Sequence, residues 1–287
     1  MPIKSDVQLR NVANVAASKT VIIDIPCGPR YHYIVLEHGY ASGTNTIAGA
    51  LANITEIRIK RNGVVYRTFS GVQLRDYNIR NGTAYDCLGL PNTAPGISIP
   101  IYFAEPWMAD EADQDAGAWV TNGWSSFVME VDLGAASTPT LVASARIDGS
   151  TVGQLNGITE VLRGQIGAAG TSFDISTLDR RGFLRSIQIY PDSGATNKPS
   201  KVTFRANGAV IAELTYSANL AKLTNLGLTP AASGRTASIY DLVFDSDGLL
   251  ASAFPMDGLK DVTLTIESAS AMSGTTTYLL SRFVPLA

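Results

Sequence analysis

Short segments in which apolar residues alternate with polar ones recur along most of the chain. Clusters of glycine, proline, asparagine and serine separate these segments. This pattern is typical of the strands of an all-β sandwich. The predicted strands are Val21–Ile25, Tyr31–Leu36, Ile54–Lys60, Val64–Phe69, Ile97–Phe103, Phe127–Leu133, Phe183–Tyr190, Lys201–Ala206, Ala209–Tyr216, Ser238–Phe244 and Val262–Glu267, with a further candidate at Leu141–Ile147.

The pattern of the first half is repeated in the second. The segment Ile57–Val65 alternates into an Asn-Gly pair, and Val202–Val210 does the same 145 residues later. An Asn-Gly pair between two alternating runs predicts a β-hairpin with a tight turn. Four more matches keep the same order while their offset falls from about 150 to 135 residues, as expected for two copies that differ in loop length. They pair Ile23–Ile25 with Phe173–Ile175, Leu74–Tyr77 with Leu220–Leu223, Ile101–Phe103 with Leu242–Phe244, and Phe127–Val131 with Val262–Ile266.

A short helix is predicted directly after each hairpin. Ser70–Arg80 is closed by an Asn-Gly pair and Ser217–Leu226 by Gly227, and both segments have a serine near the start. Residues 1–20 read either as an amphipathic arm or helix, or as a loosely held terminus. We therefore predict an N-terminal arm at 1–20 and two tandem sandwich domains at 21–150 and 151–287, each with one short helix.

Composition and charge exclude several classes of protein. Charged residues make up 16% of the chain, apolar residues 45%, and the net charge is −3. Since no Lys/Arg run is present, specific nucleic-acid binding by a charged face is not expected. No apolar stretch reaches the eighteen or so residues of a membrane-spanning helix, and the first twenty lack a secretory signal core, so we expect synthesis in the cytoplasm. Cys27 and Cys87 are interpreted as buried, reduced thiols.

The residues needed for catalysis are scarce. The chain has two histidines, His32 and His38, and neither has a further histidine or a cysteine pair nearby to complete a metal shell. We interpret them as packing or surface residues. A G-x-S-x-G elbow and a phosphate-binding glycine loop are both missing from the sequence, so we predict that the protein is not an enzyme.

Two groups of acidic residues are candidates for calcium, which prefers carboxylate-rich loops. The candidate ligands are Asp110, Asp113, Asp115, Asp245 and Asp247. Their spacing does not follow the EF-hand pattern, and the alternative is that they form solvated turns at strand ends. No other cofactor is predicted. Both readings of the acidic groups stay open at this point.

Three tryptophans, Trp107, Trp119 and Trp124, lie within eighteen residues of one another. We rank burial within their own sandwich first, contact with another subunit second and a sugar-binding platform third, because aromatic side chains serve all three purposes.

The segment Leu90–Trp107, which contains Ile-Pro-Ile-Tyr-Phe-Ala-Glu-Pro-Trp, is followed by the alternating segment Ser125–Leu133. Together they resemble the first jelly roll of the double jelly-roll major capsid proteins of tailless icosahedral bacterial viruses of the corticovirus, autolykivirus and tectivirus kind. The chain departs from that pattern at Met108, where a basic residue is expected. The resemblance covers most of residues 20–133 as recognisable phrases and the second half as architecture.

The resemblance implies a structural protein of the virion. In that family three chains form a homotrimeric, pseudo-hexagonal capsomer that contacts neighbouring capsomers, other capsid proteins such as a penton, and an internal viral membrane, which the arm 1–20 would suit. The alternative is a receptor- or glycan-binding β-sandwich, such as a spike or lectin-like module.

Overall fold

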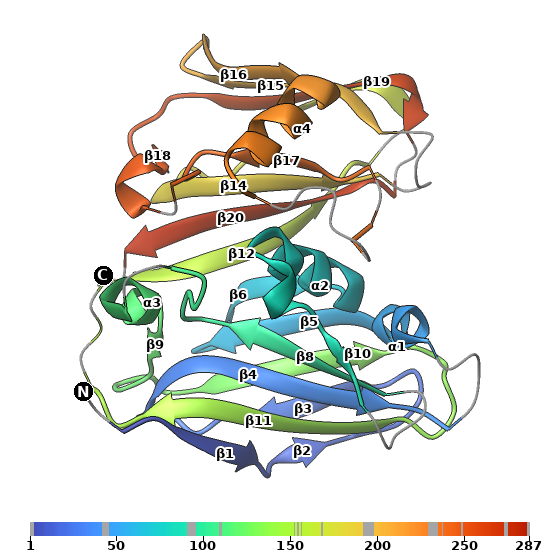
Figure 1. Cartoon of the computed structure of the whole chain (residues 1–287), viewed down its shortest axis with the longest axis vertical. Helices are drawn as coiled ribbons and strands as arrows, with labels where there is room; N and C mark the ends of the chain where they lie inside the picture. The colour runs from blue at the N-terminus through green and yellow to red at the C-terminus, as the bar shows by residue number, and fades with distance from the viewer. Residues whose placement is uncertain are drawn as a thin grey trace. The chain divides into compact units, whose positions relative to one another are not determined.

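The chain forms two compact units, Met1–Thr159 and Glu160–Pro285, in a computed structural model (Figure 1). The structure describes residues 3–41, 46–90, 96–108, 111–151, 153, 155, 157–167, 169–191, 198–228, 235–236, 238–247, 249–272 and 275–285. The two units meet within a strand that begins at Gly157, whereas the predicted domains meet at residues 150 and 151.

Unit 1 is built from two antiparallel sheets. One has the strand order β1-β11-β4-β8-β7, with β9 paired to β4, and the other has the order β6-β5-β10-β3-β2. The strands are β1 Ser5–Leu9, β2 Val12–Ala13, β3 Thr20–Asp24, β4 Arg30–Gly39, β5 Ile54–Arg61, β6 Val64–Phe69, β7 Leu88–Gly89, β8 Gly96–Tyr102, β9 Trp119–Val120, β10 Phe127–Leu133 and β11 Thr140–Asp148. The helices are α1 Ile47–Asn53, α2 Gly71–Arg80, the 3-10 turn η1 Thr83–Tyr85 and α3 Glu111–Ala116.

Unit 2 is also built from two sheets. One has the order β13-β19-β15-β16, and the other β17-β14-β20-β12, with β18 paired to β14. The strands are β12 Gly157–Gln165, β13 Gly170–Ile175, β14 Phe183–Tyr190, β15 Pro199–Ala206, β16 Ala209–Thr215, β17 Tyr240–Val243, β18 Phe254–Pro255, β19 Val262–Met272 and β20 Thr277–Pro285. The helices are α4 Tyr216–Asn225 and the 3-10 turn η3 Leu250–Ser252.

The two units share one strand order, which confirms the predicted repeat. In one sheet of each unit, the order β3-β10-β5-β6 of unit 1 corresponds to β13-β19-β15-β16 of unit 2. In the other sheet, β11-β4-β8 of unit 1 corresponds to β20-β14-β17 of unit 2. The short strands β9 and β18 pair with the corresponding strands β4 and β14. Two facing antiparallel sheets in this order are a jelly roll. The prediction of an all-β chain with two tandem jelly rolls is confirmed.

Both Asn-Gly pairs form the predicted hairpin turns. Asn62 and Gly63 have φ of 50° and 80°, and Asn207 and Gly208 have 48° and 76°. Positive φ at both central residues is what a type I′ turn needs, and Asn and Gly adopt it at low cost. The asparagines also act alike beyond the turn: Asn62 Oδ1 accepts from the backbone of Ser125 and Ser126, just before β10, and Asn207 Oδ1 accepts from two residues just before β19. Each turn therefore holds the start of the next strand of its sheet.

The predicted helices are confirmed with small changes at their ends. Ser70 caps α2 in a capping box with Gln73. α4 is capped by Thr215 and not by Ser217, because the Thr215 hydroxyl lies where it accepts from the Ala218 amide. Gly227, with φ of 72°, ends α4 in the left-handed region that favours glycine.

Two other expectations differ from the structure. A helix within residues 1–20 is wrong, since Ser5–Leu9 are extended and pair with β11. Val7 and Leu9 alternate with Asp6 and Gln8, the period of a strand. Burial of both cysteines is wrong as well, because Cys27 is exposed while Cys87 is buried.

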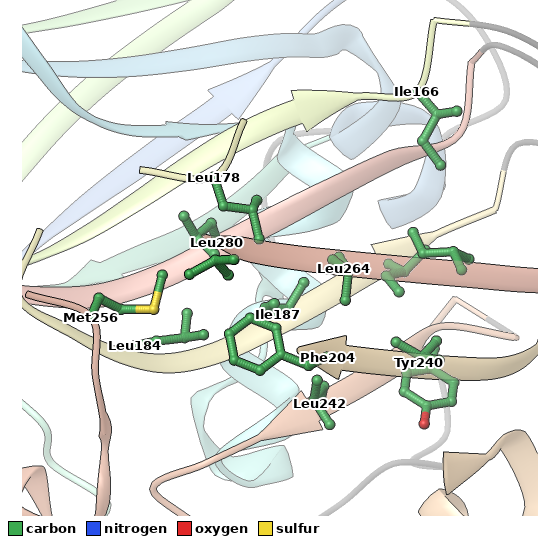
Figure 2. Packing of buried hydrophobic residues seen from close by; sticks show 14 of the residues in the cluster. Ile166, Leu178, Leu184, Ile187, Phe204, Tyr240, Leu242, Met256, Leu264 and Leu280 are labelled. Carbon is green, nitrogen blue, oxygen red and sulfur yellow. The ribbon is translucent and has the colours of Figure 1, made fainter. Parts of the chain in front are cut away.

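Each unit has its own hydrophobic core between its sheets. Figure 2 shows that of unit 2, where Leu184 and Ile187 of β14, Phe204 of β15 and Leu264 of β19 point toward one another. Alternating strands place one face of each sheet in such a core. In unit 1 the buried side chains of Phe103, Trp119 and Phe127 fill the corresponding layer.

Candidate functional site

A buried cluster of charged side chains lies at one end of unit 1. Asp148, the last residue of β11, faces the start of β4, where Arg30 and His32 lie. Arg30 Nη2 donates to Asp148 Oδ2 at 2.6 Å, and His32 Nε2 lies 2.8 Å from the same oxygen. The other ring nitrogen, Nδ1, lies 3.1 Å from Asp115 Oδ1, which also accepts from Lys4 Nζ at 2.8 Å. Four separate segments are thereby joined.

The charges of this cluster compensate one another. Two carboxylates face Lys4 and Arg30, and Asp148 is among the most buried charged residues of the unit. Burial acts to raise the pKa of Asp148, but hydrogen bonds from Arg30, the Ser150 amide and His32 outweigh it and hold that pKa below its ordinary value. Burial lowers the pKa of His32, while its contacts with Asp148 and Asp115 act in the opposite direction. A buried carboxylate keeps its charge only with such partners.

A cavity of about 200 Å³, lined by charged, polar and apolar side chains, adjoins the cluster. Its charged lining comes from Lys4, His32, Asp115 and Arg146, and Tyr33 and Gln114 add polar groups. Charged and polar side chains line part of the cavity, but they are not arranged as in a hydrolytic active site. Both ring nitrogens of His32 face carboxylates, so the ring is not placed to activate a serine or cysteine.

Unit 2 has a related cluster of its own. Arg282 of β20 donates to Glu160 of β12 at 2.5 Å and to Asp179 at 2.7 Å, and Arg181 also donates to Asp179 at 2.7 Å. The hydrogen bond from Arg282 is the main cause that holds the pKa of Asp179 far below its ordinary value. β20 and β12 of unit 2 correspond to β11 and β1 of unit 1, where Arg146 of β11 lies 3.8 Å from Asp6 of β1.

The structure separates most of the calcium candidates. Asp110 lies outside the described residues, and Asp113 is exposed on α3. Asp115 joins Asp148 and His32, whose ligand atoms all lie within 4.8 Å of one another. The other two candidates lie in unit 2 and have partners of their own: Asp245 accepts from Arg185 Nε at 2.5 Å, and Asp247 accepts from the Leu249 amide and from Ser252.

Both histidines are buried, His32 in the charged cluster and His38 in a polar network of its own, so of the two expected readings the surface one does not apply. No local spacing in the sequence connects His32 with Asp148, because 116 residues separate them. The only signal lay in the two predicted strands Tyr31–Leu36 and Leu141–Ile147, whose antiparallel pairing brings their ends together.

Two of the three tryptophans are buried within their own unit, which is the reading ranked first. Trp119 and Trp124 are buried in the core of unit 1, and their rings contact each other edge to face. Trp107 is half-buried and packs against Tyr85 and Tyr102.

His38 forms a second buried network in unit 1. Its Nδ1 donates to the Thr140 carbonyl at 3.0 Å, so Nε2 carries the lone pair that accepts from Asn53 Nδ2 at 3.0 Å. Asn53 Oδ1 in turn accepts from the Ala136 amide. This arrangement needs a neutral ring, and burial lowers the pKa of His38.

We therefore expect the free energy of unfolding to fall as the pH drops below about 6.5, which is the ordinary pKa of histidine. The folded pKa is depressed, so the unfolded chain binds more protons in that range. Each such histidine changes the free energy of unfolding by at most about 1.4 kcal/mol per pH unit. Thermal unfolding followed by tryptophan fluorescence should give a lower Tm at pH 5.5 than at pH 7.5. His38→Gln should reduce this difference without abolishing it, because His32 also contributes, whereas equal Tm values for the wild type would contradict the expectation.

Comparison with known proteins agrees with this fold. The family of viral coat protein P2 N-terminal domains matches residues 6–148, which make up nearly all of unit 1. The chain belongs to the double jelly-roll viral coat proteins. It is a structural capsid protein of the virion and not an enzyme, as predicted.

Solved structures extend the likeness to both units. The major capsid protein P2 from bacteriophage PM2 is 18% identical, with a TM-score of 0.78 over 99% of this chain and 98% of that one. The STIV major capsid protein is 11% identical, with a TM-score of 0.71 over 99% and 97%. The Faustovirus major capsid protein is 8% identical, with a TM-score of 0.59 over 100% and 91%. At these identities the likeness shows a shared fold. No curated protein sequence matches the chain.

Proposed function

We propose that three copies of this chain form a pseudo-hexagonal capsomer of an icosahedral virion. The observation that carries the proposal is the shared strand order of the two units. Two like sandwiches in one chain give six in a trimer, and six similar bodies around a threefold axis have a nearly sixfold outline. Such an outline tiles a closed shell in a way that three single sandwiches do not. Closed rings of identical subunits are a common form of assembly.

The first test is the mass of the purified protein in solution. Light scattering after size-exclusion chromatography should give about three times the 30.4 kDa of one chain. A monomer across the accessible concentration range, or a dimer, would contradict the proposal. A mass of three chains alone does not separate a shell protein from a trimeric spike, so imaging of particles completes the test.

Neighbouring capsomers and a penton are further partners in this proposal, since a six-sided capsomer does not fill a fivefold vertex. Contact with an internal membrane is also part of it. Strand β1 is not suited to contact a membrane, because it pairs with β11 and the neighbouring Lys4 is bound to Asp115. Deleting residues 2–18 would therefore disturb the fold of unit 1 itself. No helix in the described part of the chain is long and apolar enough to cross a membrane.

Calcium binding stays a proposal, and Asp115 is the candidate residue best placed for it. Asp115, Asp148 and His32 offer two carboxylate ligands and one nitrogen ligand close together. Lys4 already neutralises Asp115, so a cation has to displace it. Titration calorimetry with calcium chloride should show binding that Asp115→Asn removes and Asp113→Asn retains; wild-type protein that releases no heat would contradict the proposal.

A further inference from the structure

The strand β16 leaves one edge of its sheet open in unit 2. It pairs with β15, and among the described residues it has no second neighbour in the sheet. Its first three residues are exposed and apolar, with Val210 52% and Ile211 41% exposed. An open, apolar edge strand is a template for pairing with another chain, and soluble proteins usually blunt such edges with charge.

The corresponding strand of unit 1, β6, is covered. Arg67 of β6 is buried beside the rings of Phe103 and Trp119, and its Nε donates to the carbonyl of Thr159 at 3.1 Å. Thr159 is the last residue of unit 1, and it lies with two other buried residues at the start of β12. The outer edge of β6 is therefore covered in unit 1, whereas the outer edge of the corresponding strand β16 is open in unit 2.

The repeat also indicates what kind of segment closes such an edge. β12 pairs with β20 as β1 pairs with β11, so β1 is the counterpart of β12 in unit 1. β1 has a free edge of its own within the described residues, and Ile3 beside it is 89% exposed. Arg10, directly after β1, is opposite in charge to Glu213 of β16, which also lies 3.7 Å from Lys201 in its own chain.

We infer that the open edge of β16 in one copy of the chain docks against the segment Ile3–Ala13, which contains β1, of a second copy. Among the described residues of one chain, no strand covers the outer edge of β16, so a second copy supplies the cover in this inference. The contact joins two different surfaces, so it is heterologous and closes into a ring when three copies are related by a threefold axis. The inference rests on the proposed trimer and names the surfaces that build it.

Site-specific photo-crosslinking tests these surfaces directly. A benzophenone amino acid is placed at Ile211 in the full chain, and the same residue at Val64, an exposed apolar position beside the hairpin turn of unit 1, serves as the matched control. We expect irradiation to link the Ile211 variant between copies, with peptide mass spectrometry locating the link within residues 3–13. The Val64 variant should give at least tenfold less of that product.

The outcomes separate this inference from the trimer itself. A trimer by light scattering whose Ile211 crosslinks map to another segment, or that gives no crosslink between copies, overturns the docking of β16 on β1 and leaves the trimer standing. A monomer by light scattering overturns both. Val210→Lys supplies a second reading: it should weaken trimer formation at least tenfold relative to Val142→Lys, an exposed position on β11, and equal association of the two variants would oppose the inference.

Discussion

Replacing Asp148 by alanine is expected to lower the free energy of unfolding of unit 1 by about 3–5 kcal/mol. The carboxylate is buried and accepts from Arg30 and His32. Its removal leaves the Arg30 guanidinium buried beside a weaker, more distant partner, since Asp115 Oδ2 lies 3.6 Å away. Breaking one partner of a buried ion pair costs far more than the pair itself contributes.

Urea unfolding followed by tryptophan fluorescence measures this effect, because all three tryptophans lie in unit 1. Asp113→Ala is the matched control: it removes an exposed carboxylate from the same unit, and should change the free energy by no more than about 0.5 kcal/mol. If the two variants unfold at the same urea concentration, the buried cluster does not stabilise the unit.

The second large effect is expected at Gly182, in the loop before β14. Its φ is 72°, and a Cβ at this position would lie 2.1 Å from the carbonyl oxygen of Phe283. The loop has little freedom to move, since the Gly182 amide donates to Asp257 and its carbonyl accepts from Met256. Gly182→Ala therefore adds a steric clash to the cost of a left-handed alanine, together roughly 3 kcal/mol or more.

Gly258→Ala separates the two contributions. Gly258 has φ of 79° and open space around the position of a Cβ, so only the backbone cost of about 1–2 kcal/mol applies. Amide hydrogen exchange of β14 and β20 should report a larger loss of protection in Gly182→Ala than in Gly258→Ala. Equal losses would mean that the contact with Phe283 is not rigid.

The hairpins could be predicted from the sequence because their signal is local. An Asn-Gly pair requires no knowledge of the partner strand, and the turn fixes the register of both strands. Two copies of that signal, in order with four others, revealed the repeat. Strands without such signals escaped prediction. β20 is buried over nearly all its length, so it shows no alternation, and β1 is a short edge strand rich in polar residues.

The charged cluster could not be predicted for a different reason. Its members are brought together by the pairing of β4 with β11, in which Arg30 faces Asp148 across a separation of 118 residues. The carboxylate pattern pointed to Asp115, but neither its histidine partner nor its lysine partner lies near it in the chain. Contacts of this kind depend on the register of distant strands, and no local spacing encodes that register.

Electron cryomicroscopy of the native particles tests the central claim most directly. If the duplicated jelly roll supplies the tile of the shell, the surface is covered by six-lobed capsomers, and each contains three chains with two lobes per chain. Capsomers with three lobes, or a protein confined to sparse projections at the vertices as expected of a spike, would contradict it.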